Sequence, residues 1–491
     1  MRWSFGKMRK RANRQSNSLN RPNWRDYQNY HLGERKMPWS RRFKLPVVVI
    51  VGLILVGIFN LDGFFDDQTA ENRQGTAQAS SPSAIQKAPP AIHKESEEKT
   101  APTVSWSSKN LTGKQAVRQL LAGIPVMGGL PAKSFQLPLE RQMLQVQTSL
   151  DEDLQNYLLG KMDRENSRYI GIVVMEADTG RVLAMAGFDR NDPEANPCLR
   201  SEFPAASIFK IVTAASAVDA IGLTADSPLS FNGYKHTLYK KQLTDLVNRY
   251  TTTVSFKDAF AQSINPVFGK LGQLRLGKPL LQKSAEAFGF NEPLDFELPL
   301  DASRFSISDQ PYNWAEVASG FNRNTTISPL HGALMATAVL NGGFMVSPSL
   351  VDQIVDGEGQ AIYNRPTAAL HQVMSAQASV VLGQMMETTI SSGTGRKAFR
   401  GYDRDKVLSR LQIGGKTGSI DNSTHEVRFD WFVGFAQEKE GGKKLAIAVM
   451  VAHQDYIGTR STQYARMAIT RFFERDAMIA GAQKKTGRRD T

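Results

Sequence analysis

Seventeen consecutive residues without a charged side chain, Leu45–Leu61, set the tightest limit on how this chain can fold. A stretch of this length lies at the short end of what spans the hydrocarbon core of a bilayer. Basic residues crowd its N-terminal side and Asp62, Asp66 and Asp67 follow it, an asymmetry that keeps the basic side in the cytoplasm. We therefore expect a single-pass anchor in the cytoplasmic (inner) membrane, with all later residues extracytoplasmic (periplasmic). A buried core helix is the alternative.

The positive charge of the chain is concentrated in its first 44 residues. The formal net charge is +13, and residues 1–44 contain 13 Lys and Arg against Asp26 and Glu34. The rest of the chain is therefore close to neutral, whereas a nucleic-acid-binding domain carries its basic residues on a folded surface. The pattern predicts a solvated basic cytoplasmic tail over residues 1–44 and no nucleic-acid partner.

Two segments separate the expected anchor from the first regular elements. Residues 62–105 are rich in Ala, Ser, Pro, Gln, Glu and Lys, with few large apolar residues. Such a segment cannot bury enough apolar surface to fold, so we expect a disordered linker that lets later residues stand away from the membrane. Residues 106–147 carry a short helical pattern around Gln115–Leu121 and several Gly and Pro breaks, and we interpret them as a small N-terminal extension.

Regular elements begin at residue 148. Ser149-Leu150-Asp151-Glu152 has the form of a capping box that opens a helix ending near Met162. Two apolar runs joined by Asp178-Thr179-Gly180 predict a β-hairpin at the edge of a sheet. Further helices and strands are expected at Ser207–Ile221, Ala376–Ser391, Gln412–Gly415, Trp431–Ala436, Leu445–Ala452 and Thr462–Ile479. This order predicts an α+β fold over residues 148–479, in which helices flank an antiparallel sheet and a mostly helical subdomain is inserted. A basic C-terminal tail follows at residues 480–491.

Three short motifs occur in order within residues 148–479: Ser207-Ile208-Phe209-Lys210, Ser263-Ile264-Asn265 and Lys416-Thr417-Gly418. Each pattern alone is weak, because Ser96-Glu97-Glu98-Lys99 also fits the first and Lys485-Thr486-Gly487 also fits the third. Context separates them. Ser96 lies in the expected linker, where no scaffold holds a nucleophile against its base, and Lys485 lies in the basic tail, where we expect a surface loop.

The first motif has the residues of an activated nucleophile. Ser207 opens an apolar helical pattern, and Lys210 lies three residues later, so both side chains share one helix face and can touch. Among apolar neighbours Lys210 should lose hydration, which lowers its pKa and lets the neutral amine accept the proton of Ser207. A capping serine with a lysine that extends to solvent is the structural alternative.

The second motif predicts a tight turn between two helices. Ser263 and Asn265 follow one helical pattern, and Pro266 suits the first position of the next helix. On such a turn Ser263 could relay a proton between Lys210 and a leaving group, while Asn265 hydrogen-bonds a substrate amide. A Ser/Asn turn that merely caps a helix is the alternative.

The third motif extends to Ser419 and lies at the edge of an expected strand. The glycines, Gly418 among them, permit close approach of an extended peptide, which can dock by strand addition. Lys416 would supply positive charge for a peptide carboxylate, and the Thr417 and Ser419 hydroxyls would donate hydrogen bonds. The backbone N–H groups of Ser207 and Ser419 would form an oxyanion hole.

Residues 148–475 resemble the transpeptidase domain of penicillin-binding proteins, within the serine acyl-enzyme superfamily that also holds the serine β-lactamases. Beside the three motifs, several other segments are similar to the family in the same order: Thr148–Gln155, Asp178–Met185, Pro204–Lys210, Ile327–Leu330, Asn341–Gly343, Gly393–Gly395 and Trp431–Phe435. The resemblance implies a monofunctional, class B-like protein whose Ser207 takes an acyl group from peptidoglycan stem peptides or β-lactams. It also implies work alongside other cell-wall synthesis proteins. Residues 106–147 would then be a reduced form of the pedestal domain of that class, and Ser419 stands where Thr is commoner.

Three readings of the site stay open at this point. Peptidoglycan D,D-transpeptidation passes the acyl group to an amine, and a D,D-carboxypeptidase or β-lactamase passes it to water. A non-catalytic β-lactam-binding envelope sensor is the third, which the complete set of motifs disfavours. We expect neither a cofactor nor a metal, because the seven histidines share no ligand spacing. The single cysteine, Cys198, lies in a loop pattern and is a poor candidate for the nucleophile.

Overall fold

The computed structural model describes residues 111, 113–122, 133–139 and 142–486. All of them fall within one of the two units into which the chain divides, the unit that holds Ser107–Thr491. The predicted basic tail, anchor and linker of residues 1–105 lie outside these ranges. Within them, no helix combines the length and the apolar character needed to cross a membrane.

A five-stranded antiparallel sheet forms the centre of this part of the chain. Its strands run in the order β11-β12-β13-β3-β4, so β11 and β4 are the two edges. The five strands are β3 (Ser167–Glu176), β4 (Val182–Asp189), β11 (Leu411–Asp421), β12 (Arg428–Glu438) and β13 (Lys444–His453). The predicted hairpin is β3–β4 and lies at one edge. The α+β fold with an antiparallel sheet is therefore confirmed.

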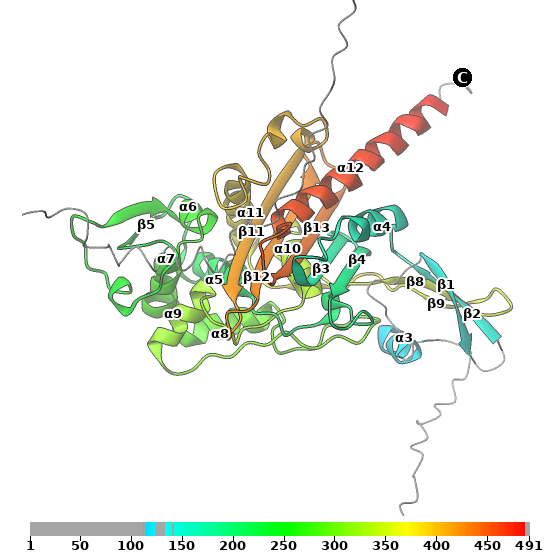
Figure 1. Cartoon of the computed structure of the whole chain (residues 1–491), viewed down its shortest axis with the longest axis horizontal. Helices are drawn as coiled ribbons and strands as arrows, with labels where there is room; N and C mark the ends of the chain where they lie inside the picture. The colour runs from blue at the N-terminus through cyan, green and yellow to red at the C-terminus, as the bar shows by residue number, and fades with distance from the viewer. Residues whose placement is uncertain (1–110, 112, 123–132, 140–141, 487–491) are drawn as a thin grey trace, which may run out of the picture. The chain divides into compact units, whose positions relative to one another are not determined.

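Both faces of this sheet are covered by helices, because its strands are apolar on both faces. Ile170 and Ile172 of β3 pack in one core with residues of α4 and α12, whereas Val173 and Met175 pack in another with α5, α10 and α11. Figure 1 shows α12 running across the strands. These five helices are α4 (Glu152–Lys161), α5 (Lys210–Ile221), α10 (Pro329–Leu340), α11 (Ala376–Ser391) and α12 (Ser461–Thr486).

A mostly helical region lies to one side of β11, shown in green in Figure 1. Its helices are α6 (Phe256–Ala261), α7 (Asn265–Lys270), α8 (Gly277–Ala287) and α9 (Pro311–Ser319), with a π-helical turn at Leu271–Leu276. The sequence predicted this subdomain, but it did not predict the two-stranded hairpin of β5 (Pro228–Phe231) and β6 (Thr252–Ser255) within it. The subdomain therefore forms a wall beside the edge strand rather than a layer on the sheet.

The predicted N-terminal extension shares a sheet with a much later segment. The order is β1-β2-β8-β9, and β2 pairs with β8 across about 200 residues of chain. The strands are β1 (Ser134–Leu139), β2 (Gln142–Thr148), β8 (Val351–Val355) and β9 (Ala361–Asn364). Helix α3 (Gly113–Leu121) is bound to the segment before β8 by the buried Lys114. Lys114 Nζ donates to Ser347 Oγ and to Pro348 O, both at 2.7 Å. A further antiparallel pair is formed by β7 (Phe344–Val346) and β10 (Leu370–Gln372), which precede and follow β8 and β9 in the chain.

Several local predictions were wrong at single residues. The N-cap of α4 is Asp151, whose carboxylate accepts from Leu154 N, while Ser149 donates instead to Val182 O at 2.7 Å. Pro266 is the second residue of α7 rather than the first. Lys485 and Thr486 lie in α12, which continues past the predicted end at residue 479, and not in a surface loop.

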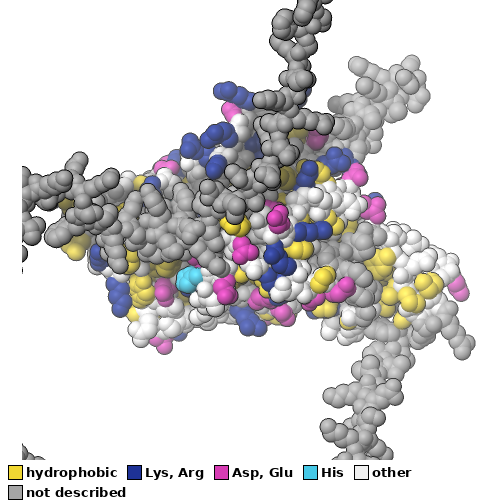
Figure 2. Space-filling view, viewed as in Figure 1, with side chains coloured by type: hydrophobic (Ala, Val, Ile, Leu, Met, Phe, Trp, Pro, Cys, Tyr) yellow, Lys and Arg dark blue, Asp and Glu magenta, His cyan; other side chains and the backbone are white. Residues whose placement is uncertain are grey.

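Basic and acidic side chains are interspersed over much of the described surface on the face in Figure 2. This distribution agrees with a sequence that is close to neutral after its first 44 residues.

Candidate active site

The three predicted motifs meet where the start of α5, the α6–α7 turn and the edge strand β11 come together. Ser207 lies in a 3₁₀ turn, Ala206–Phe209, that continues into α5. The α-helix thus begins at Lys210 and not at Ser207 as predicted. Ala206 has φ +50°, a conformation that costs an L-residue about 1–3 kcal/mol and persists where the surroundings enforce it. The turn before Ser207 is therefore held in place by its neighbours.

The end of α9 enforces this turn. Gly320 caps α9 with φ +64°, and a Cβ built on it would lie 1.9 Å from Ala206 O. Only glycine lets the two backbones come this close. The preceding residue, Ser319, accepts a hydrogen bond from Lys210 Nζ through its backbone carbonyl. One helix terminus therefore supports both residues of the first motif.

Lys210 is buried and faces three oxygen acceptors. Its Nζ lies 2.8 Å from Ser207 Oγ and 2.8 Å from Asn265 Oδ1, and it also contacts Ser319 O. Burial and, to a lesser degree, the charge of Lys416 hold the pKa of Lys210 well below its ordinary value. A neutral amine has a lone pair that can accept a proton from Ser207. The contact that the i, i+3 spacing predicted is therefore present.

Ser263 and Asn265 occupy the predicted turn between α6 and α7. Ser263 has φ +55° and is buried, and its Oγ accepts from Lys416 Nζ at 3.0 Å. Asn265 is fixed at both ends of its amide, because Oδ1 accepts from Lys210 and Nδ2 donates to His236 O at 3.1 Å. The turn thus links the two lysines of the site through two side chains.

Lys416 points into the same cluster rather than into solvent. It is buried, and its Nζ donates to Ser263 Oγ and, at 2.8 Å, to Thr417 O. Burial lowers its pKa to about 7, so the amine is only partly protonated at neutral pH. The sequence predicted that Lys416 supplies positive charge for a substrate carboxylate, and with a pKa of about 7 that charge depends on pH.

The backbone of β11 passes close to the nucleophile. A Cβ built on Gly418 would lie 3.2 Å from the backbone N of both Ser207 and Ile208, tighter than most such contacts. A glycine there lets the strand edge approach the Ser207 amide, as the predicted oxyanion hole requires. The Thr417 hydroxyl lies 2.6 Å from that of Thr394.

Ser419 lies exposed at the same edge, but its hydroxyl is already engaged. It donates to Oδ1 of Asp430, its cross-strand partner on β12, at 3.3 Å. The predicted role of this hydroxyl as a donor to substrate therefore competes with a neighbouring carboxylate.

Sequence reasoning missed the supporting residues Ser319, Gly320, His236 and Asp430. A glycine such as Gly320 is a typical signal for a helix end, but it indicates nothing about the distant contact with Ala206. Trp431 belongs to a segment that resembles the family, and its Nε1 donates a hydrogen bond of 2.9 Å to Pro204 O, two residues before Ala206. Ser96, whose segment also fits the first motif, lies outside the described residues. Within the described ranges no cluster of three His, Cys, Asp or Glu side chains is arranged to hold a metal ion.

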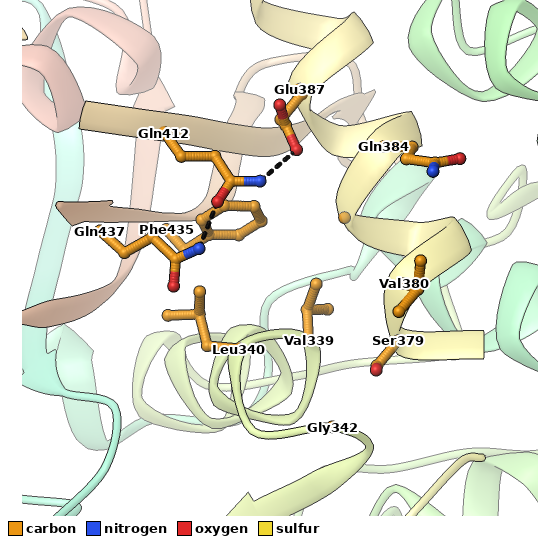
Figure 3. Close-up of a pocket in the computed structure, with 11 residues that line it drawn as sticks. Val339, Leu340, Gly342, Ser379, Val380, Gln384, Glu387, Gln412, Phe435 and Gln437 are labelled. Carbon is orange, nitrogen blue, oxygen red and sulfur yellow. Dashed lines mark hydrogen bonds between the residues drawn. The ribbon is translucent and has the colours of Figure 1, made fainter. Parts of the chain in front are cut away.

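A cavity of about 370 Å³ lies away from the nucleophile, at the far end of β11. Figure 3 shows its polar side, where Gln412 of β11 donates to Glu387 of α11 at 2.5 Å and accepts from Gln437 of β12. Val339 and Leu340 from α10 line it opposite these groups. None of the motif residues borders this cavity.

Comparison with known proteins gives one consistent result. Residues 170–471 match the family model described as the penicillin binding protein transpeptidase domain. The "Peptidoglycan D,D-transpeptidase PbpA" of Mycobacterium tuberculosis is 25% identical over 316 residues, which cover 57% of this chain and 61% of the relative. "Stage V sporulation protein D" of Bacillus subtilis is 24% identical, over 62% of this chain and 49% of the relative. The chain thus spans about half to three fifths of the length of these relatives.

Solved structures agree in fold. The D,D-transpeptidase domain of a peptidoglycan glycosyltransferase from Eggerthella lenta superposes with a TM-score of 0.55 at 24% identity, covering 68% of this chain and 84% of that one. Penicillin binding protein 3 from Mycobacterium tuberculosis, crystallised with ampicillin, gives a TM-score of 0.57 at 22% identity, covering 68% and 78%.

Proposed function

Because this chain belongs to the penicillin-binding protein transpeptidase family, we propose that it is a peptidoglycan D,D-transpeptidase that works through a Ser207 acyl-enzyme. The relative from Mycobacterium tuberculosis carries the name peptidoglycan D,D-transpeptidase, which supports this proposal. The observation that carries the proposal is the 2.8 Å contact between Ser207 Oγ and a buried Lys210 whose pKa is lowered.

In the first step Ser207 Oγ attacks the carbonyl carbon between the two terminal D-alanines of a stem peptide. The hydroxyl proton passes to the neutral amine of Lys210, and the Ser207 and Ser419 N–H groups stabilise the oxyanion. Lys210 then returns this proton through Ser263 to the departing amine, so that the C–N bond breaks and D-alanine leaves with Ser263 and Lys210 restored. The acyl group remains on Ser207 as an ester.

In the second step an amine of a neighbouring stem peptide attacks this ester. The proton of this amine passes to Ser263, from there to Lys210 and finally to Ser207 Oγ as the ester bond breaks. Ser207 regains its hydroxyl, and a new amide joins the two stems. Lys416 lies 3.0 Å from Ser263, so its charge favours transient negative character on that hydroxyl. Penicillins would acylate the same serine.

We place the protein in the cytoplasmic membrane, held by one anchor at residues 45–61, with residues 106–491 outside the cytoplasm. The charge asymmetry around Leu45–Leu61 supports this placement. A tethered domain meets both stem peptides at high effective concentration, which favours transfer to an amine over transfer to water.

Intact mass of the full-length protein in detergent, after incubation with benzylpenicillin, tests the acyl-enzyme. We expect one adduct that disappears in Ser207→Ala and persists in Ser96→Ala, the matched control with the same motif spacing. An adduct that survives Ser207→Ala would refute the assignment of the nucleophile.

A second experiment separates transfer from hydrolysis. The protein is given lipid-linked or polymeric peptidoglycan, and the digested product is examined by mass spectrometry. We expect cross-linked dimers that depend on Ser207. Trimmed tetrapeptides without dimers would identify a carboxypeptidase, rapid turnover of penicillin would identify a β-lactamase, and adduct formation without any product would identify a sensor.

Reporter fusions test the membrane topology. A reporter at the N-terminus should be active in the cytoplasm, and one placed after residue 105 should be active outside it. The opposite pattern would overturn the placement of the anchor.

A further inference from the structure

Lys416, which the sequence assigned to a substrate carboxylate, and Ser419, one of its predicted hydroxyl donors, are both engaged elsewhere. Lys416 is buried and donates to Ser263 and to Thr417 O. The Ser419 hydroxyl donates its single proton to Asp430. A stem peptide or a penicillin that brings a carboxylate to this end of the cleft would therefore meet a buried Lys416 and a Ser419 hydroxyl that are both already hydrogen-bonded.

Asp430 is a buried carboxylate fixed from several sides. Oδ2 accepts from Ser461 N, at the start of α12, at 3.1 Å, and it lies 3.6 Å from His453 Nε2. Burial acts to raise the pKa of Asp430, but the contact with His453 and the charge of Arg460 outweigh it, so the pKa lies below its ordinary value. Asp430 is therefore an anion at neutral pH.

Arg460 brings a positive charge to the same carboxylate. Its Nη1 lies 3.9 Å from Asp430 Oδ1, the oxygen that also accepts from Ser419 at 3.3 Å. The guanidinium and the Ser419 hydroxyl are therefore no further apart than the sum of these distances, about 7 Å. A carboxylate that is hydrogen-bonded at both of its oxygens spans about this distance.

The guanidinium is also available for a ligand. The Arg460 side chain is 46% exposed, and its N–H groups make no hydrogen bond to any described residue. At 3.9 Å its contact with Asp430 is electrostatic, which orients the side chain without using its donors. Arginine presents paired donors in the geometry that a carboxylate accepts.

Other cations near this end of β11 are held at a different residue, Asp421. Arg428 Nη1 lies 3.0 Å from Asp421 Oδ1, and Arg323 Nε donates to Asp421 O at 2.7 Å. His425 also lies against Asp421, at 3.6 Å. These groups are held at Asp421, whereas the exposed Arg460 lies at Asp430, the carboxylate that also accepts from Ser419.

We propose that Arg460, held beside Ser419 by the buried Asp430, is the residue that binds the carboxylate of the acyl donor. The inference rests on the proposed function, because it concerns the leaving-group end of the same cleft. Asp430 acts as a positioning residue. When a carboxylate arrives, the Ser419 hydroxyl can turn from Asp430 toward it, and Arg460 then lies between the two anions.

The test compares two acylating compounds that differ in one charge, benzylpenicillin and its uncharged methyl ester. The second-order rate of Ser207 acylation is measured by intact mass for the full-length wild type and for Arg460→Gln, Arg460→Lys and Arg404→Gln. Arg404 is 91% exposed and serves as the matched control. For benzylpenicillin we expect Arg460→Gln to slow acylation about 10-fold, the effect of losing one charge-assisted contact.

The uncharged ester should react equally fast with wild type and Arg460→Gln, and Arg460→Lys should fall between them with benzylpenicillin because it keeps the charge but not the paired donors. Loss of rate with both compounds would assign Arg460 a structural role and overturn the inference, as would no loss with either. If neither compound acylates wild-type Ser207, the proposed function fails, which is a different result from a failure confined to Arg460.

Discussion

A matched pair of glycines tests whether the end of α9 holds the nucleophile in place. Gly222 caps α5 with φ +67° and ψ +27°, and Gly320 caps α9 with φ +64° and ψ +26°. Their backbones are nearly identical, but a Cβ on Gly222 would meet nothing within 4 Å, whereas one on Gly320 would lie 1.9 Å from Ala206 O. Replacement by alanine therefore separates the cost of the left-handed conformation from the cost of the collision.

The magnitudes follow from these contacts. Gly222→Ala should lower the free energy of unfolding by about 1–2 kcal/mol, the cost of an L-residue in this conformation. Gly320→Ala carries the same cost plus about 1–3 kcal/mol for overpacking. Since real Cβ contacts essentially never fall under 3.0 Å, the Ala206 carbonyl must move by about 1 Å. A shift of that size beside Ser207 can slow the reaction by about 10²-fold.

Urea unfolding gives the two free energies, and time-resolved intact mass with benzylpenicillin gives the acylation rates. We expect Gly222→Ala to acylate at the wild-type rate and Gly320→Ala to be slower by at least about 10-fold. Equal stabilities together with equal, wild-type acylation rates would show that α9 does not brace the turn before Ser207.

Three further outcomes follow from the same site. Lys210→Ala should slow acylation by about 10²-fold or more in the mass assay, as for loss of a general base, and an unchanged rate would remove Lys210 from the mechanism. The pKa of Lys416 is about 7 in the folded protein, and in the unfolded chain it has the ordinary lysine value. Between these two values the unfolded state binds more protons than the folded state. The wild type should therefore gain stability as pH rises from 7 to 10. Urea unfolding of Lys416→Met over that range should show a smaller gain, because the lowered pKa of Lys210 still contributes, and parallel curves would contradict the assignment. Burial raises the pKa of the Cys198 thiol, so iodoacetamide should label Cys198 only in denaturant, and labelling of the native protein would show that its segment opens.

The elements that depend on local sequence were predictable, and those that depend on distant partners were not. Ala376–Ser391 has the predicted bounds because its cap, Ser375, and its apolar pattern are both local. The strand at Gln412–Gly415 was predicted too short, since β11 continues to Asp421 through the polar motif residues. An edge strand beside a cleft needs no apolar alternation, so its pattern resembles a loop.

The candidate site was likewise predictable from the sequence only where it depends on residues close together in the chain. The contact of Ser207 with Lys210 follows from i, i+3 spacing alone, and the structure has it at 2.8 Å. The lowered charge of Lys416 could not be read from Lys-Thr-Gly, because it comes from burial against the α6–α7 turn. Asp430 and Arg460 are likewise ordinary in sequence. Their proximity to Ser419 is fixed only by strand register and by the start of α12.

The pairing of β3 with β13 has a consequence for how the protein is made. Ile172 lies opposite Val449, so during synthesis β3 has no partner on this side until a strand about 280 residues later has been made. At ordinary elongation rates that interval is on the order of 10–60 s, during which the hairpin exposes an unpaired edge open to misassembly. Every residue of the three motifs has been translated before Lys444, the first residue of β13. A nascent or truncated chain that stops there therefore contains the full set of motif residues but lacks the strand that joins β11–β12 to β3–β4.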